Sequence, residues 1–205
     1  MCNHSHGDPC SHASDSVDLS ASFSLYKYID LHNVECLNES VAGSGRLVFK
    51  PYENRKDSTQ FVESDADAEL LFNIPFTGNI KLKGIIIAGE ATNHHPKEIS
   101  LYKNRPFMNF DDTDDSGDQA FSLNMDPQGE VIYPLKASRF ANVHSLTIFV
   151  RRNFGESTTR LHYIGLRGDF TPMTKQGVVI ANYELRPSLA DHKTDLFNHG
   201  SHIIE

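Results

Sequence analysis

The first twelve residues of the chain concentrate side chains that could ligate a metal ion. Thiol and imidazole groups of this kind suit zinc, nickel or copper, and a flexible segment could wrap a cation with them. Their spacing matches no closed structural site, and only one further cysteine follows. We therefore favour an unstructured tail over a metal site, and we expect no cofactor. The candidate ligands are Cys2, His4, His6, Cys10 and His12.

An acidic run, DDTDDSGD at residues 111–118, invites a calcium interpretation. A loop that starts at Asp112 places Asp114 in register with the EF-hand template. The twelfth position of that template must be a bidentate Glu, and here it is Leu123. The sequence therefore excludes an EF-hand. A looser site of oxygen ligands and a solvated acidic loop both remain, and we favour the solvated loop.

Catalytic motifs are not recognisable in this sequence. His94 and His95 are adjacent, so at a strand end their side chains would point in opposite directions, and we predict a surface loop. His162 lies within an apolar strand pattern, and we predict a packed, hydrogen-bonded histidine rather than a base. The Gly43-Ser44-Gly45 sequence is not a nucleophile elbow, and no P-loop, HExxH or CxxC motif occurs. We therefore expect that the protein is not an enzyme.

Short strand patterns separated by turn signals fill most of the chain, and no long amphipathic helix is predicted. This spacing favours an antiparallel sandwich or barrel. Polar composition at the ends predicts disordered tails at residues 1–20 and 186–205, around one domain at residues 21–185. The predicted strands are residues 26–29, 46–50, 70–75, 80–88, 99–103, 120–124, 131–133, 143–151, 161–167 and 178–183.

The stretch from Phe61 to Gly89 combines an acidic segment with two apolar strand patterns, which Thr77-Gly78-Asn79 separates. Its apolar side chains cannot stay exposed without a large solvation penalty, so we predict a central hairpin with a charged loop beside it. Ser64 could cap one helical turn there. We call residues 63–69 the acidic loop. Its fixed charges could steer a basic partner, or they could form a merely solvated turn. The charged residues are Glu63, Asp65, Asp67 and Glu69.

The overall charge restricts the classes of partner. A formal net charge of −8 at pH 7 opposes approach to nucleic acid or to anionic lipid. No apolar run reaches the length of a signal peptide core or a membrane span, so we expect a cytosolic or nucleocytoplasmic protein. Three cysteines do not form a disulfide framework, and Cys36 is predicted to be a small buried hydrophobe. We expect a monomer.

Five pieces of sequence together carry a family resemblance. They are CLNES at residues 36–40, SGR at 44–46, the stretch 61–89, LYKN at 101–104 and YIGLRG at 163–168. In this order they resemble the PITH domain, which is found at the C-terminus of proteasome-interacting thioredoxin-like proteins. The absence of CxxC, and of room for a thioredoxin domain of roughly 100 residues, indicates a stand-alone member.

The resemblance implies a jelly-roll β-sandwich of the galactose-binding-like type, acting as an adaptor that associates with proteasome subunits. Independently of the resemblance, the residues of YIGLRG predict a structural role. Gly165 would permit close packing, and Arg167 would pair with Asp65 or Asp169. The alternative function is a jelly roll that binds a carbohydrate or another small polar ligand, by fold analogy. The chain has no Trp, so the aromatic platform would fall to Tyr52, Tyr102 and Phe107.

Overall fold

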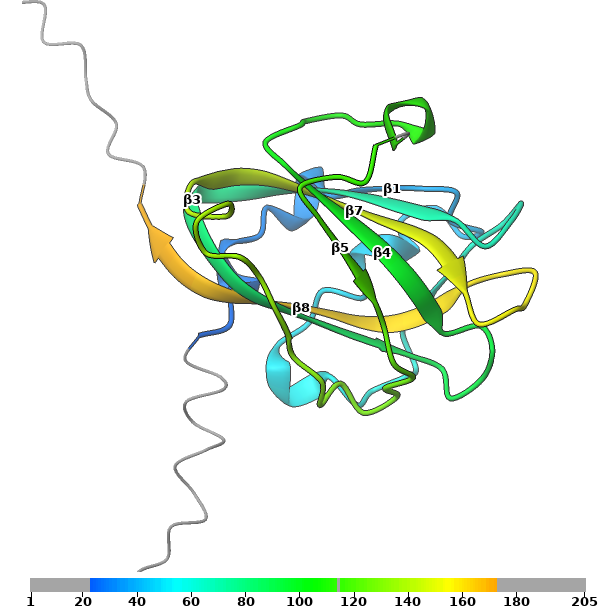
Figure 1. Cartoon of the computed structure of the whole chain (residues 1–205). Helices are drawn as coiled ribbons and strands as arrows, with labels where there is room; N and C mark the ends of the chain where they lie inside the picture. The colour runs from blue at the N-terminus through cyan, green and yellow to red at the C-terminus, as the bar shows by residue number, and fades with distance from the viewer. Residues whose placement is uncertain (1–22, 114, 173–205) are drawn as a thin grey trace, which may run out of the picture. The chain divides into compact units, whose positions relative to one another are not determined.

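One long strand, β3 (Leu70–Gly89), connects the two halves of the fold. Its first part pairs antiparallel with β7 (Val143–Asn153), and its second part pairs antiparallel with β8 (Arg160–Thr171). The pairing register with β7 shifts between Pro75 and Ile80, and there the strand passes from one sheet to the other. The computed structural model describes residues 23–113 and 115–172 (Figure 1).

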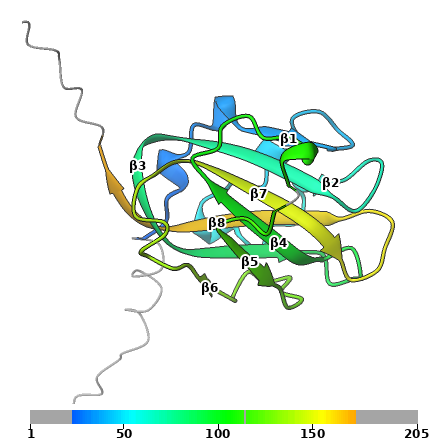
Figure 2. The same ribbon diagram turned by 45° about the horizontal axis from the view of Figure 1, so that its top comes forward.

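The strands form two antiparallel layers that share β3 (Figure 2). One layer runs β1-β3-β7-β4-β5, and the other runs β2-β8-β3-β6. The remaining strands are β1 (Glu35–Leu37), β2 (Val62–Glu63), β4 (Pro96–Lys103), β5 (Gln119–Ser122) and β6 (Tyr133–Pro134). Short 3-10 helices lie in the connections: η1 (Tyr26–Tyr28), η2 (Leu31–Asn33), η3 (Ser44–Arg46), η4 (Tyr52–Asn54) and η5 (Phe110–Thr113).

The main core lies between the two layers, because alternate side chains of the long strands point inward. Each of these large apolar side chains stabilises the fold by about 1.5–3 kcal/mol relative to its exposed state. The outer faces carry two smaller clusters, one around Tyr102 and Phe149 and one around Ile86 and Tyr163. The all-β jelly-roll sandwich predicted from the sequence is confirmed. Core residues from the long strands include Leu70, Phe72, Ile74, Ile85, Ile87, Leu146, Ile148, Val150, Leu161, Ile164 and Leu166.

The predicted central hairpin at residues 70–88 is wrong, because the two apolar patterns belong to one bent strand. The halves do not pair with each other: Phe72 lies opposite Ile148 of β7, whereas Ile85 lies opposite Leu166 of β8. The Thr77-Gly78-Asn79 segment is therefore a bend between layers rather than a turn. A Cβ added at Gly78 would lie 2.5 Å from the ring of Phe170, so glycine allows β8 to pass close to this bend.

Three local predictions near the N-terminal half are also wrong. Residues 26–28 form η1 rather than a strand, and Ile29 forms only an isolated β-bridge with Phe76. Arg46 ends η3, and residues 47–50 do not form a strand. Ser64 caps no helix, because it forms a β-bridge with Glu39. The predicted tails and the strand at residues 178–183 lie outside the described residues. Within the described part, no helix has the length and apolarity to cross a membrane.

Candidate functional site

Asn38, which directly follows β1, holds the acidic loop in place. Its Nδ2 donates hydrogen bonds to Asp67 Oδ1 (2.8 Å) and to the carbonyl of Glu69 (2.7 Å). Its Oδ1 accepts from the N–H of Ala66 at 3.0 Å, and its carbonyl accepts from the N–H of Asp65 at 3.0 Å. The φ angle of Asn38 is +67°, a left-handed conformation that Asn adopts more readily than most residues. One side chain therefore fixes most of the loop.

The opposite side of the acidic loop is held by the residue that precedes β8. The backbone N–H of Thr159 donates to Ser64 Oγ at 2.8 Å, and Thr159 Oγ1 donates to the carbonyl of Ala68 at 2.6 Å. Thr159 is fully buried. Because both sides are bonded to neighbouring segments, the loop presents its charges in a fixed arrangement.

Glu39 is engaged by the SGR segment. Its carboxylate accepts hydrogen bonds from the N–H of Gly43, from the N–H of Gly45 (2.6 Å) and from Ser44 Oγ (3.3 Å). A Cβ added at Gly45 would lie 2.3 Å from Cys36 Cβ, so only glycine fits there. The CLNES and SGR pieces are thus packed and bonded to each other, and their role is structural.

Cys36 is partly buried and packs against the main core. Burial, together with the nearby Glu39 carboxylate, raises the pKa of the Cys36 thiol far above its ordinary value. The thiolate is the reactive form of cysteine, so this residue is a poor nucleophile.

The four acidic residues predicted to bind a partner differ in how far they are exposed to one. Asp65 and Asp67 are exposed, whereas Glu69 is half-buried in the same loop. Burial, followed by the Asp67 charge, raises the pKa of Glu69. Glu63 is bonded within the fold: its Oε2 lies 2.8 Å from Arg160 Nη2, and its Oε1 accepts from Thr158 Oγ1 at 3.0 Å. The hydrogen bond from Arg160 is the main reason that the pKa of Glu63 is lowered.

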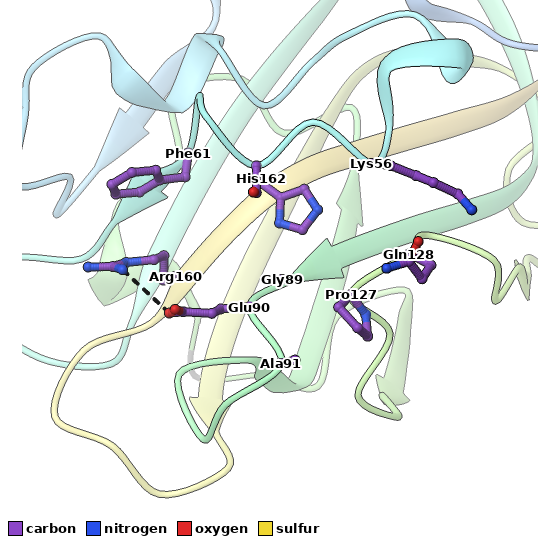
Figure 3. Close-up of a pocket in the computed structure, with 10 residues that line it drawn as sticks. Lys56, Phe61, Gly89, Glu90, Ala91, Pro127, Gln128, Arg160 and His162 are labelled. Atoms are coloured by element: carbon purple, nitrogen blue, oxygen red, sulfur yellow. Dashed lines mark hydrogen bonds and ion pairs between the residues drawn. The ribbon is translucent and has the colours of Figure 1, made fainter.

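Arg160 lies in the wall of a pocket with a volume of about 270 Å³, beside the C-terminal end of β3 (Figure 3). We call it the Arg160 pocket. Arg160 Nη1 lies 3.4 Å from Glu90 Oε2, and its guanidinium lies over the ring of Phe61, 4.7 Å from the centroid. Lys56 and Gln128 face the same space from other segments, and His162 faces it from β8, two positions after Arg160. The acidic loop and this pocket are therefore joined through the Glu63–Arg160 ion pair.

His162 is 4% exposed in the wall of the Arg160 pocket, and its Nε2 has no hydrogen-bond partner within the described residues. Burial is the main cause that lowers the pKa of His162, and the Lys50 charge lowers it further. The predicted packing of this histidine is confirmed, but the predicted hydrogen bonding is incomplete. Arg160 Nε is a second buried atom without a partner among the described residues.

The prediction that His95 lies on the surface is wrong, because its side chain is fully buried. The N–H of Asp126 donates to His95 Nε2 at 3.1 Å, so the ring proton lies on Nδ1, which donates to the carbonyl of Pro96 at 2.7 Å. Burial is the main cause that lowers the pKa of His95. His94 is half-buried, with Nδ1 2.8 Å from the carbonyl of Thr158.

In the acidic run at residues 111–118, the carboxylates of Asp112, Asp115 and Asp118 bond to different partners. Asp112 accepts from the N–H of Asn109, Asp118 accepts from the N–H of Lys103, and Asp115 pairs with Arg105 at 3.1 Å. Across residues 23–113 and 115–172, no three His, Cys, Asp or Glu side chains are grouped to hold a metal ion. The N-terminal candidates Cys2, His4, His6, Cys10 and His12 lie outside these ranges.

The aromatic residues predicted as a platform do not lie together in one site. Tyr102 is fully buried, and Tyr52 is half-buried with the Arg55 guanidinium 4.2 Å from its ring centroid. Phe107 is 80% exposed, in a left-handed conformation at φ +59°. Sequence reasoning missed Phe61, which is 38% exposed in the wall of the Arg160 pocket.

In the YIGLRG segment, a Cβ added at Gly165 would lie 2.6 Å from Tyr163 Oη, so the ring of Tyr163 occupies the space beside the glycine. The ion pair predicted between Arg167 and Asp65 or Asp169 is not formed within the described residues. Asp169 pairs with Lys83 at 2.8 Å, and among the described residues Arg167 has no ion-pair partner. Lys83 is the nearer cation because it stands on β3 directly beside this part of β8.

Comparison with known proteins identifies the family. The family model described as "PITH domain" matches residues 15–187. The chain belongs to the PITH domain family. It is 56% identical to PITH domain-containing protein 1 of Homo sapiens, over 89% of this chain and 86% of that protein. It is 38% identical to PITH domain-containing protein 1 of Dictyostelium discoideum, over 100% and 98%. The chain covers most of the length of each of these relatives.

Solved structures with a similar course of the chain include carbohydrate-binding proteins. The CBM32-3 module of a family 31 glycoside hydrolase from Clostridium perfringens has a TM-score of 0.49 and 12% identity, covering 73% of this chain and 98% of that chain. The fucose-binding module SpX-3 of Streptococcus pneumoniae has a TM-score of 0.44 and 12% identity, over 67% and 93%.

Proposed function

We propose that this PITH protein is a non-catalytic binding module that associates with the proteasome through its acidic loop, in the cytosol or the nucleus. The observation that carries the proposal is the double attachment of the loop, through Asn38 on one side and Thr159 on the other. A surface that is ordered before binding loses less conformational entropy when the partner docks.

The charges of the loop favour a basic partner surface. Asp65 and Asp67 are exposed, and the Asp65 carboxylate makes no hydrogen bond or ion pair within the described residues. Fixed charges at the rim of an interface mainly raise the association rate and orient the partner. The choice of the proteasome as partner rests on the PITH family, whose thioredoxin-bearing members are proteasome-interacting.

The absence of catalysis in the proposal follows from the state of the reactive side chains. The thiol of Cys36 has a raised pKa, and both ring nitrogens of His95 are engaged by the backbone. Neither residue is suited to act as a nucleophile or as a mobile base.

Binding of the full chain to purified proteasome, measured by biolayer interferometry at two salt concentrations, tests the proposal. We expect association of the wild type, and slower association with a weaker salt dependence for Asp65→Asn. Glu53→Gln is the matched control, because it removes the same charge from an exposed position on η4. Failure of the wild type to bind, or equal rates for the two variants, would contradict the proposal.

A further inference from the structure

The Arg160 pocket contains polar atoms that the fold does not use. Arg160 Nε and His162 Nε2 are both buried and lack partners within the described residues, although they stand two positions apart on β8. Buried polar groups are nearly always hydrogen-bonded, to protein, to ordered water or to a ligand. Figure 3 shows the His162 ring directed into the space that Lys56, Gln128 and Arg160 surround. Two such atoms beside one cavity leave unused hydrogen-bonding capacity in its wall.

The charges around the pocket disfavour an ionic ligand. Arg160 is paired with Glu63 at 2.8 Å and with Glu90 at 3.4 Å, and Lys56 lies 3.4 Å from Glu130. Each cation of the wall therefore already has a carboxylate partner, which an incoming anion would have to displace. An incoming cation would be repelled by the Arg160 and Lys56 charges. A neutral ligand avoids both penalties.

The donors and acceptors still free in the pocket suit hydroxyl groups. The guanidinium of Arg160 has five N–H donors, of which two are used in its ion pairs. Glu90 and the amide of Gln128 add acceptors and donors from two other segments. A hydroxyl group both donates and accepts, so several adjacent hydroxyls can bridge such a mixed set.

Phe61 supplies an apolar surface beside these polar groups. The Arg160 guanidinium covers part of the ring, and the side chain remains 38% exposed. The C–H groups of a polyhydroxylated ring could pack on this surface while its hydroxyls bond to the wall. Ligand sites commonly combine apolar surface with a few convergent polar groups in this way.

We infer that the Arg160 pocket binds a neutral polyhydroxylated ligand of the size of a single sugar ring. The pocket volume of about 270 Å³ sets this size. The inference is independent of the proposed association with the proteasome, because it rests on the pocket wall and not on the acidic loop. The same chemistry fits a free sugar or a sugar carried on a protein.

Saturation-transfer NMR on the full chain tests the inference, with galactose, N-acetylglucosamine and myo-inositol as neutral probes. Acetate and inorganic phosphate are the charged probes. We expect saturation transfer to at least one neutral probe, with loss of that signal in Phe61→Ala and in Gln128→Ala. Phe107→Ala is the matched control, because it removes an exposed aromatic ring that does not line this pocket, and it should leave the signal unchanged. Unchanged thermal midpoints would show that the variants fold.

Three results would overturn the inference: no transfer to any neutral probe, equal transfer in the wild type and both pocket variants, or displacement of the neutral probe by acetate or phosphate. A serine-linked N-acetylglucosamine peptide and the same peptide without the sugar distinguish the two sources of the ligand. Tighter binding of the glycopeptide than of the free sugar would assign the pocket to a modified protein. Equal binding of the glycopeptide and of the free sugar would assign the pocket to the free sugar.

Discussion

The acidic loop and the Arg160 pocket are neighbours that share the Glu63–Arg160 ion pair, yet they use their polar groups in opposite ways. In the loop, the Asn38 side chain has hydrogen-bond partners for both its nitrogen and its oxygen. In the pocket, Arg160 Nε and His162 Nε2 have none among the described residues. Satisfied buried polar groups fix a structure, whereas an unsatisfied one costs about 1–3 kcal/mol. The comparison separates the sequence motifs that maintain the fold from the side chains that remain available to a ligand.

The largest effect that would sharpen this comparison is expected from Gly45→Ala. The new Cβ would lie 2.3 Å from Cys36 Cβ, so the SGR turn must move away from β1. We expect the free energy of unfolding to fall by about 2–3 kcal/mol, as in other overpacked sites. Urea denaturation measures this change. A loss below about 0.5 kcal/mol, the range of ordinary surface substitutions, would show that the contact is not structural.

Asn38→Ala should lower the free energy of unfolding by about 2 kcal/mol, because it removes three side-chain hydrogen bonds. It also places alanine at φ +67°, a left-handed conformation that alanine adopts less readily than asparagine. Asn38→Gly is the control, because it removes the same bonds but adopts the left-handed conformation freely. Its loss should be smaller. If the glycine variant were as stable as the wild type, the attachment of the acidic loop at residue 38 would depend on backbone conformation and not on the side-chain amide.

The pH dependence of stability should report the buried histidines. His95 and His162 have pKa values lowered chiefly by burial, so the unfolded chain binds more protons than the folded chain below the ordinary histidine pKa of about 6.5. Stability should therefore fall as the pH decreases from about 6.5 toward the lowered values, by at most about 1.4 kcal/mol per pH unit for each proton. The Lys50 and His95 charges also lower the pKa of His162, whereas a backbone hydrogen bond with Pro127 and the Asp57 charge oppose the shift.

Denaturation of His162→Leu across this pH range tests the assignment. The variant should show a shallower decline, because one of the two histidines no longer takes up a proton on unfolding. At pH 7 it should be no less stable than the wild type by more than about 1 kcal/mol, since the lost Nε2 had no partner to leave unpaired. An identical pH profile would mean that His162 is not held neutral by burial.

The smallest effect is expected from Asp65→Asn on stability. Its side chain is exposed and has no ion-pair partner among the described residues, so the free energy of unfolding should change by less than about 0.5 kcal/mol. Thermal melting checks this. A larger loss would move Asp65 from the binding surface to the structural framework and would weaken the contrast with Asn38.

The outcome at particular residues shows how far the sequence could predict this structure. Strand β7 was predictable, because Leu146, Ile148 and Val150 alternate with residues of the other face. The path of β3 was not, because a bent strand and a hairpin share the same apolar pattern, and only the partners of Phe72 and Ile85 distinguish them.

The candidate site was predictable only where its residues are neighbours in the chain. The acidic loop is contiguous, so its charges were visible in the sequence. The burial of His95 depends on Asp126, which lies 31 residues further along the chain. The Arg160 pocket likewise joins Phe61, Glu90 and Gln128 to β8, and no local pattern connects segments so far apart.

A cryo-electron microscopy structure of the full chain bound to purified proteasome tests the proposed function most directly. We predict that Asp65 and Asp67 lie in the interface, opposite Lys or Arg side chains of a proteasome subunit, with the loop backbone unchanged. A complex in which the acidic loop faces solvent, or in which the loop has left Asn38, would contradict the central claim.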